Sequence, residues 1–513
     1  MGDEWSVSDL LIIGGGINGA GIARDAVGRG LSVLLCEQDD LAAHTSSAST
    51  KLIHGGLRYL EHFEFGLVRK ALQEREILMR AAPHLISPLR FVMPHAGKLR
   101  PAWMMRVGLF LYDHLGKREL LPPSESIDLR RHPAGAPLQP KAKQGFVYSD
   151  GLVDDARLVV ANAQDAAERG ARILTRTRVE SAERGERHWN ATLRCGPGGT
   201  QRVVKARCIV NAAGPWVTEV LRKSLRIESK RHLRAAKGSH IVVPRLYDHE
   251  YAYTFQNHDK RIVFAIPYRS DFTLIGTTDV EYRDDPQRVS IAEEEVSYLC
   301  AAVNGYFMRQ VTPSDVTWSY SGVRPLLEDE ADDLSAVTRG YELELDDGPG
   351  KAPLLSVFGG KLTTYRRLAE EAVALLHGPL GTLKPAWTAR TPLPGGDIPG
   401  ADFERYVRQL SQRYAWLPPE LAQRYARAYG TRTERLLAGA GAPADLGAEI
   451  GDGLYSIELA YLTRYEWAQT IEDILWRRSK LGLRASPETV RRLGEWLAAH
   501  GTQAQSGKRQ QCA

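Results

Sequence analysis

The first forty residues combine two apolar runs with a glycine-rich turn between them. Residues 10–13 (LLII) form a continuous apolar run, which is typical of a strand buried on both faces of a sheet. Apolar positions then recur at helical spacing over 17–27, and the following glycines favour the end of a helix. Because residues 31–37 (LSVLLCE) have the pattern of another buried strand, we expect a strand–helix–strand unit with parallel strands.

The middle of the chain continues with helix and strand patterns. Helical periodicity over about 66–87 ends near Pro83, and a further helix is expected over 154–169. A strand over 171–181 follows, and then a hairpin that ends in the apolar strand 208–210. These elements extend the opening unit into an α/β domain.

Two later regions have a different character. Alternating apolar and polar residues with Gly, Pro and Asp turns predict an antiparallel sheet over 237–245, 261–282 and 315–327. A Pro- and Gly-rich stretch near residue 391 then precedes helical patterning over 402–500. We therefore expect a linker and a separate helical domain.

Composition places the chain among globular proteins. Its 513 residues are 43% hydrophobic and 25% charged, and at roughly 150 residues per domain the length suggests two or three folding units. The 67 Lys and Arg against 62 Asp and Glu leave a net charge of +5, too small to indicate nucleic-acid binding. Scattered cysteines without a CxxC or metal-ligand spacing favour a reduced, cytosolic setting and no metal site.

Charge is unevenly distributed along the chain. Residues 69–118 contain ten Lys or Arg and three Asp or Glu, and residues 100–118 (RPAWMMRVGLFLYDHLGKR) interleave basic and large apolar side chains. This pattern fits an amphipathic element at a membrane surface, and it also fits a core helix with a solvated basic face. The longest stretch without charged residues, 10–23, is shorter than the ~20 residues that span a bilayer, so any membrane contact is expected to be peripheral.

The turn after the first strand carries a dinucleotide-binding signature. Gly14, Gly16 and Gly19 stand in G-x-G-x-x-G register, where they permit a tight turn, close approach of a pyrophosphate and helix–strand packing. Glu37 ends the second strand, where an acid can bind ribose hydroxyls and disfavours a 2′-phosphate. The motif alone does not separate FAD from NAD.

A polar stretch, TSSASTKLIHGGLRYL (45–60), follows this unit and is unsuited to a hydrophobic core. Taken with DLLIIGGGINGAGIARDAVGRG, KGSHIVVPR, IGTTDVEY, YSGVRPL and LLSVFGGKLTTYR, it resembles the FAD-dependent (aerobic) glycerol-3-phosphate dehydrogenases, which belong to the glycine-oxidase and D-amino-acid-oxidase class of flavoproteins. The resemblance runs from about residue 8 to residue 500 in preserved order, and it is strongest before residue 370.

The resemblance implies an α/β fold with a Rossmann-like FAD-binding domain, an antiparallel β-sheet substrate domain and a C-terminal helical domain. Residues 1–390 would comprise a discontinuous FAD-binding domain (about 1–80, 145–235 and 350–385) interleaved with the substrate domain (about 81–144 and 236–349). A linker over 391–400 and the helical domain over 401–505 would follow.

The resemblance also implies site residues. The FAD-binding set is Gly14, Gly16, Asn18, Gly19, Glu37, Ser46, Ser47, Ser49, Lys51, Leu52, Gly55, Val179, Gly214, Gly360, Leu362 and Thr363. The substrate-binding set is Arg58, Tyr59, His54 and Arg339, and the catalytic set is His240, Arg324 and Lys361. Arginine suits a phosphate dianion because its planar guanidinium binds two oxygens at once, although a surface location is the default for any single Arg.

His240 is the leading candidate for the base that takes the C2 hydroxyl proton, because imidazole titrates near working pH; His54 is the alternative. A hydrogen-bonded core histidine is the structural alternative for His240 at the start of an apolar strand.

The implied reaction is oxidation of sn-glycerol 3-phosphate to dihydroxyacetone phosphate, with electrons passed to a membrane quinone. The protein would be cytoplasmic, bound peripherally to the cytoplasmic face of the inner membrane, and compatible with a homodimer. Two alternatives stay open: a related flavin oxidase that uses O2 on another small substrate, and a membrane-surface nucleotide-binding scaffold without turnover.

Overall fold

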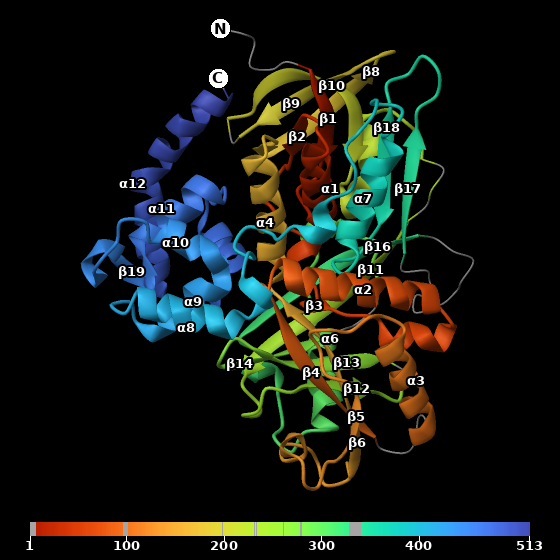
Figure 1. Ribbon diagram of the computed structural model, residues 1–513, viewed down its shortest axis with the longest axis vertical. Coiled ribbons are helices and arrows are strands. Elements are labelled where there is room, and N and C mark those ends of the chain that lie inside the picture. The colour runs from red at the N-terminus through yellow and green to blue at the C-terminus, as the bar shows by residue number, and fades with distance from the viewer. Residues whose placement is uncertain are drawn as a thin grey trace.

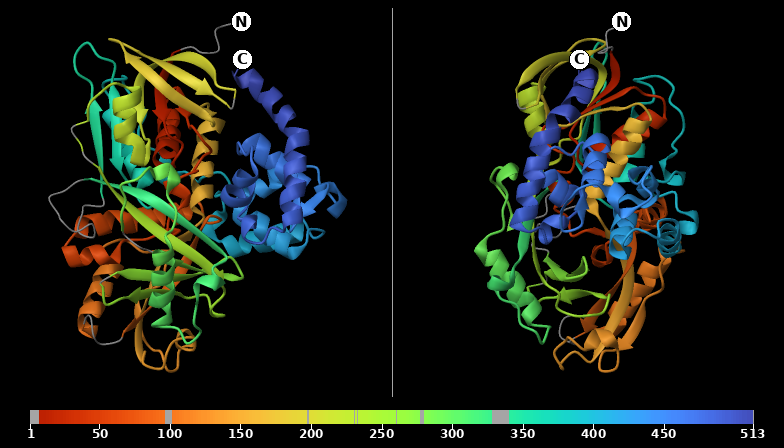
Figure 2. Two further views of the ribbon diagram at one scale, coloured as in Figure 1. Left: turned by 180° about the vertical axis from the view of Figure 1, so that it is seen from behind. Right: turned by 90° about the vertical axis from the view of Figure 1, so that its left-hand side faces the viewer.

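Two sheets and a helical unit make up the fold (Figure 1). The structure is a computed structural model that describes residues 7–95, 101–196, 198–229, 231, 233–259, 261–276, 280–327 and 340–512, with side chains up to residue 500 except that of residue 327. The first sheet lies at one end of the molecule (top in Figure 1), and the second sheet lies at the opposite end. The C-terminal helices run along one side (Figures 1 and 2).

The first sheet contains the predicted strand–helix–strand unit. Its strand order is β17-β18-β10-β1-β2-β7, and the hairpin β8–β9 is joined to this sheet because β9 pairs with β10. Strands β7, β2, β1, β10 and β18 run parallel, whereas β17 runs antiparallel at the edge. The bounds are β1 Ser8–Ile13, β2 Val33–Cys36, β7 Arg172–Leu174, β8 Thr177–Arg184, β9 Trp189–Cys195, β10 Thr200–Asn211, β17 Tyr341–Asp346 and β18 Leu354–Gly359.

Helices α1 (Ile17–Gly28), α4 (Asp155–Glu168) and α7 (Tyr365–Leu375) pack together on this domain. Helix α1 fits closely here because small residues face its neighbours: a Cβ on Gly21 would lie 2.8 Å from the ring of Tyr365. Asp154 caps α4 by accepting a hydrogen bond from the amide of Arg157, which confirms the expected helix start.

The prediction of a single strand over 171–181 is wrong in one respect, because the structure divides this stretch into two strands, β7 and β8. Arg176 lies between them with φ of +51°, a left-handed conformation that interrupts an extended chain. The predicted strand 208–210 is the buried end of the longer strand β10.

The second sheet has the order β15-β11-β14-β13-β12-β4-β6-β3, with β16 paired to β11 and β5 paired to β6. The expected antiparallel pairing holds for β11, β13, β14 and β16, but β12 pairs parallel to β4, so the sheet is mixed. The bounds are β3 Leu52–Ile53, β4 Ile86–His95, β5 Glu125–Asp128, β6 Gln144–Val153, β11 Leu233–Pro244, β12 Ala252–Gln256, β13 Ile262–Tyr268, β14 Phe272–Gly276, β15 Val280–Glu281 and β16 Trp318–Leu327.

Strand β6 pairs along its whole length with β4, so the chain returns to the first domain only after Val153. Helices α2 (Phe65–Ala81), α3 (Ala102–His114) and α6 (Glu293–Asn304) also belong to this part of the chain, and α2 ends close to the predicted position.

The C-terminal unit contains α8 (Phe403–Arg413), α9 (Pro419–Tyr429), α10 (Thr433–Leu436), α11 (Ser456–Tyr465) and α12 (Pro487–Cys512). A small hairpin, β19 (Glu449–Gly451) and β20 (Leu454–Tyr455), was not expected in this helical domain. The preceding linker is packed against α1 and the end of α2: the Leu393 amide donates to the Ala81 carbonyl at 2.8 Å, and Arg24 donates to the Thr391 carbonyl at 3.0 Å. These contacts hold the helical unit in one place.

Candidate active site

A cavity of about 910 Å³ lies where the carboxyl ends of the parallel strands face the second sheet. Its walls come from the turn after β1, the end of β2, the turn after β10 and the loop after β18. Strands β11 and β16 of the second sheet close the other side. The crevice at the carboxyl edge of a parallel sheet is where this class of fold binds ligands.

The glycine-rich turn leaves room for backbone only. Gly14 has φ of +110°, and a Cβ there would lie 2.6 Å from the carbonyl oxygen of Ala212. A Cβ on Gly19 would lie 1.9 Å from the carbonyl oxygen of Gly14. At Gly16, on the cavity wall, a Cβ would come within 3.1 Å of the Ser46 hydroxyl, which accepts a hydrogen bond from the Ile17 amide at 3.0 Å.

Glu37 is fixed beside this turn. Its carboxylate accepts hydrogen bonds from the amides of Gly15 at 2.6 Å and Asp39 at 2.8 Å, and it lines the cavity. Burial raises the pKa of Glu37, and the two amides oppose that rise. The carboxylate is therefore held in place next to the amino end of α1, where the helix dipole is positive.

Most of the Ser/Thr segment faces the cavity. Of residues 45–52, six line it (Thr45, Ser46, Ala48, Ser49, Thr50 and Leu52), whereas Ser47 and Lys51 lie outside the lining. Lys51 is buried behind the wall because its ammonium binds Asp155 at 2.9 Å and the Ser47 carbonyl at 3.0 Å. Burial alone would lower the pKa of Lys51, but Asp155 raises it above its usual value. Lys51 therefore supports the wall with a charged ammonium.

Other predicted cofactor residues divide in the same way. Gly19 packs against the turn, and the Gly55 amide donates to the Tyr112 hydroxyl at 2.7 Å, so neither residue lines the cavity. The remaining predicted cofactor residues are all in the lining: Gly14, Gly16, Asn18, Glu37, Ser46, Ser49, Leu52, Val179, Gly214, Gly360, Leu362 and Thr363.

His240 reaches the cavity from β11. A Cβ on Gly276, its partner on β14, would overlap the imidazole at 1.9 Å, so the glycine makes room for the ring. The ring stacks on Tyr320 at 4.8 Å between centroids, and its Nε2 hydrogen bonds to the Thr50 hydroxyl at 3.0 Å. Sequence reasoning did not select Thr50 as a site residue, although its hydroxyl stands in the Ser/Thr run that was selected.

The end of β18 and the loop after it contact three predicted residues from elsewhere in the chain, Tyr59, His54 and Asn18. The Lys361 ammonium donates to the Tyr59 hydroxyl at 3.1 Å and lies 4.3 Å from the centre of that ring. The His54 amide donates to the Thr363 hydroxyl at 3.3 Å. Asn18 of α1 donates to the Gly359 carbonyl at 3.1 Å, so this loop connects α1 with the segment before α2.

A second cavity, of about 1160 Å³, adjoins the first and was not predicted. The two cavities share Thr50, Leu52, His54, Tyr59 and Arg324. The far wall is largely apolar and includes Met104, Met105, Val107, Leu109 and Leu111 of α3. Arg58 lines this second cavity only, and Arg339 lies outside the described residues.

Within the described chain, Glu37, Asp39 and His44 each place one potential ligand atom within 4.8 Å of the others. These atoms already have protein partners: Glu37 accepts two amides, and His44 Nε2 bonds Asp39 at 2.8 Å. The group is accounted for as a hydrogen-bonded cluster on the cavity wall.

One part of the lining suits the pyrophosphate of a dinucleotide. Buried Asn18 Oδ1, on the first turn of α1, has no hydrogen-bond partner among the described residues. Gly214 has φ of +58°, and no atom lies within 4 Å of the position a Cβ would take there. Backbone amides, a helix start and open space thus occur together, which is the combination that can bind a pyrophosphate.

Comparison with known proteins agrees with this geometry. The family model described as FAD dependent oxidoreductase matches residues 9–366, and the model described as C-terminal domain of alpha-glycerophosphate oxidase matches residues 386–503. A protein of Pseudomonas aeruginosa named glycerol-3-phosphate dehydrogenase is 57% identical over 491 residues, covering 96% of this chain and 95% of that protein.

Two other relatives are named for different substrates. The aerobic glycerol-3-phosphate dehydrogenase of Escherichia coli is 52% identical, and the D-erythritol 1-phosphate dehydrogenase of Brucella abortus is 51% identical; each alignment covers 96% of this chain and 98% of the relative.

Solved structures share the fold. The glycerol-3-phosphate dehydrogenase from Bacillus halodurans complexed with FAD matches with a TM-score of 0.78 and 29% identity, covering 96% of this chain and 91% of that one. Glycine oxidase from Bacillus cereus matches with a TM-score of 0.55 and 18% identity over 72% of this chain and 98% of that one. The predicted fold class is confirmed.

We expect Gly16→Ala to weaken FAD binding by about tenfold or more, because a methyl group would crowd the Ser46 hydroxyl where the backbone must approach a pyrophosphate. Gly198→Ala is the control, since no atom lies within 4 Å of that Cβ. Titration of the apoprotein by flavin fluorescence measures both dissociation constants. Equal values for the two variants would contradict a pyrophosphate at Gly16.

Proposed function

This chain belongs to the FAD-dependent oxidoreductase family, and on that basis we propose that it oxidises sn-glycerol 3-phosphate to dihydroxyacetone phosphate. FAD is its cofactor, and when bound it supplies N5 as the acceptor of the hydride that leaves C2 of the substrate. The observation that carries the proposal is the wall shared by the two cavities. Thr50, Tyr59 and Arg324 line that wall, and hydrogen bonds connect His240 and Lys361 to it.

Cationic groups on this wall suit a phosphate ester. Arg324 faces both cavities and Lys361 faces the first, so the two side chains can bind the phosphate dianion and stabilise the developing alkoxide. Tyr59 fixes the Lys361 ammonium by accepting its hydrogen bond. Arg58 approaches from the second cavity, and Arg339 remains a candidate that rests on the sequence resemblance alone.

His240 is proposed as the base that takes the C2 hydroxyl proton. A hydrogen bond between Nε2 of the imidazole and the Thr50 hydroxyl, together with stacking on Tyr320, fixes the orientation of the ring. A base held in this way keeps its geometry during proton transfer, which is the requirement for general-base catalysis. His54 borders both cavities and is the alternative base.

The second cavity supports an apolar electron acceptor such as a membrane quinone. Its wall is built on α3, where Trp103 is 67% exposed and Phe110 is 60% exposed, and Phe63 on the neighbouring segment is 78% exposed. Large apolar side chains gathered on one surface mark a membrane or partner contact. We therefore extend the proposal to peripheral attachment at the cytoplasmic face of the inner membrane through α3. In the described part of the chain, no helix has the length and apolar character needed to cross a membrane.

A second candidate substrate is D-erythritol 1-phosphate, because a relative named D-erythritol 1-phosphate dehydrogenase is 51% identical over nearly the whole chain. Both compounds are phosphate monoesters of small polyols, so the same cationic wall suits either. A second candidate acceptor is O2, as in a flavin oxidase.

Purified protein should be yellow, and its flavin absorbance should bleach within seconds of anaerobic addition of glycerol 3-phosphate and much more slowly with D-erythritol 1-phosphate. If only D-erythritol 1-phosphate bleached the flavin, that compound would replace glycerol 3-phosphate as the assigned substrate. Reoxidation by a quinone analogue, compared with peroxide formed in air, distinguishes the two acceptors.

The variant His240→Gln should bind FAD normally and slow anaerobic bleaching by about 10²- to 10⁴-fold, because the amide keeps a hydrogen bond to Thr50 but cannot take the proton. Stopped-flow absorbance measures this rate. His54→Gln is the matched variant, and a larger loss there than at His240 would move the base to His54.

For attachment through α3, we expect the double variant Trp103→Ser/Phe110→Ser to bind anionic phosphatidylglycerol vesicles at least about tenfold more weakly, because two exposed aromatic rings no longer leave water. Val203→Ser/Met308→Ser removes apolar side chains that are exposed elsewhere and serves as the control. Vesicle co-sedimentation measures binding, and bleaching by substrate should be unchanged in both. Equal vesicle binding by the two double variants would place the contact on another surface.

A further inference from the structure

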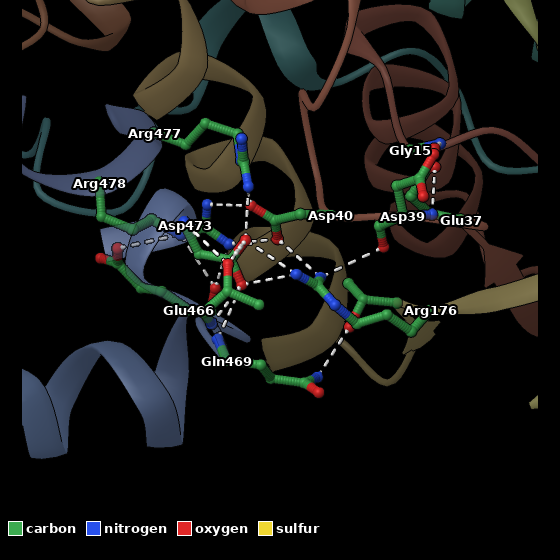
Figure 3. Close-up of polar contacts among 12 residues, drawn as sticks. Gly15, Glu37, Asp39, Asp40, Arg176, Glu466, Gln469, Asp473, Arg477 and Arg478 are labelled. Carbon is green, nitrogen blue, oxygen red and sulfur yellow. Dashed lines mark hydrogen bonds and ion pairs between the residues drawn. The ribbon is translucent and has the colours of Figure 1, made fainter. Parts of the chain in front are cut away.

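A group of buried and half-buried charged residues joins the C-terminal unit to the loop that follows Glu37 (Figure 3). We call it the interface charge cluster; its members are Asp40, Arg176, Glu466, Asp473, Arg477 and Arg478. Arg478 has no exposed surface, and its guanidinium binds both carboxylate oxygens of Asp40 at 2.7 and 2.8 Å. Arg477 adds a hydrogen bond to Asp40 at 2.6 Å.

Asp473 forms the other half of the cluster. It is fully buried and accepts two hydrogen bonds from Arg176, at 2.7 and 2.8 Å. Burial alone would raise the pKa of Asp473, but Arg176, Arg478 and Arg477 lower it well below the usual range, so the carboxylate is charged. The Arg176 amide donates to the Asp39 carbonyl at 2.8 Å, which ties the cluster to the residue whose amide binds Glu37.

A second connection reaches the far end of the same loop. Glu466 of the C-terminal unit binds Arg157 of α4 through two hydrogen bonds, at 2.7 and 2.9 Å. Two residues earlier on α4, Asp155 accepts hydrogen bonds from the Ser49 hydroxyl at 2.7 Å and from the Lys51 ammonium. The C-terminal unit therefore holds residue 40 directly, and it contacts α4, the helix that holds residues 49–51.

The chain between these two anchors forms much of the cavity wall. Its lining residues are Ala42, Ala43, His44, Thr45, Ser46, Ala48, Ser49 and Thr50. This stretch contains one 3-10 turn, Thr45–Ser47, and no strand, so regular backbone pairing does little to fix its shape. Anchors at both ends therefore contribute to how the wall is placed, together with side-chain hydrogen bonds along the stretch such as that of Thr45 to the Val323 carbonyl.

We propose that the C-terminal helical unit is a positioning element for FAD: through the interface charge cluster it holds residues 40–51 in the shape that retains the flavin cofactor. This inference rests on the proposed flavin site. Arg478 and Asp40 act through the loop and not by contact with the cofactor. Buried ion pairs add little net stability over apolar packing, whereas their geometry fixes one docked arrangement, which is the property a positioning contact needs.

The test compares two arginine–carboxylate pairs, each with two hydrogen bonds, in the full-length holoprotein. Arg478→Met removes the contact to Asp40 across the boundary. Arg424→Met is the control: it removes a contact to Glu458 that lies wholly within the C-terminal unit and has both hydrogen bonds at 2.7 Å. We expect Arg478→Met to release FAD about tenfold faster or more, and to alter the visible circular dichroism of bound flavin. Arg424→Met should retain FAD as wild type does, although both variants unfold at lower temperature. The rise of free-flavin fluorescence after dilution measures release.

Conservative variants guard against loss of folding. Asp40→Asn keeps the shape of the side chain, and Arg478→Lys keeps the charge without the two-oxygen contact; both should release FAD faster than Arg424→Met does. The proposal is overturned when these variants and Arg478→Met release FAD no faster than Arg424→Met.

Glu37→Gln separates this result from failure of the flavin site itself, because Glu37 lies in the proposed site and outside the cluster. Fast release from Glu37→Gln with wild-type release from the Arg478 variants would reject the positioning role alone. Wild-type release from both would reject the proposed flavin site, and the positioning role with it.

Discussion

The chain must cross from the first sheet to the second between β2 and β3, and the whole site depends on how this crossing is held. The crossing has almost no backbone–backbone pairing with either sheet, so hydrogen bonds from side chains hold it in place. Thr45 donates to the Val323 carbonyl on β16 at 2.7 Å, and the Tyr320 hydroxyl of the same strand donates to the Ser49 carbonyl at 2.8 Å. Ser46 accepts from the start of α1. The hydroxyl-rich composition is thus what lets a buried irregular segment satisfy its polar groups.

The same crossing brings the two halves of the chemistry together. On one side it lies against the glycine turn and Glu37, and on the other it hydrogen bonds through Thr50 to His240 of the second sheet. Tyr59, which follows β3, accepts a hydrogen bond from Lys361, which follows β18 of the first sheet. A cofactor bound along the first sheet and a substrate facing the second sheet would therefore meet at one wall, which also borders the apolar cavity on α3.

Local pattern was enough to predict the parts of the fold whose determinants are near in sequence. The apolar run of β1, the glycine turn and α1 follow from about twenty consecutive residues, and the family-level motifs identified the fold class. Contacts between distant residues were out of reach. Thr50 and His240 are 190 positions apart, and nothing near Lys51 indicated that Asp155, 104 positions later, would turn its ammonium away from the cavity. The parallel pairing of β12 with β4 and the left-handed Arg176 also depend on tertiary packing that overrides strand periodicity.

The interface between the C-terminal unit and the first domain shows how specificity and stability are divided in this protein. The unit has its own apolar core, built on side chains such as Tyr425, Leu454 and Leu462, so its folding does not require buried charges at the boundary. Desolvating Asp40 and Arg478 costs free energy that their mutual attraction largely offsets, and an apolar contact of the same area would stabilise as well. An apolar contact, however, tolerates sliding, whereas a guanidinium that binds two carboxylate oxygens accepts one geometry. Because the partner residue stands three positions after Glu37, that geometry is transmitted to the cofactor wall through very little chain. The position of the charges, more than their energy, explains why this boundary is ionic.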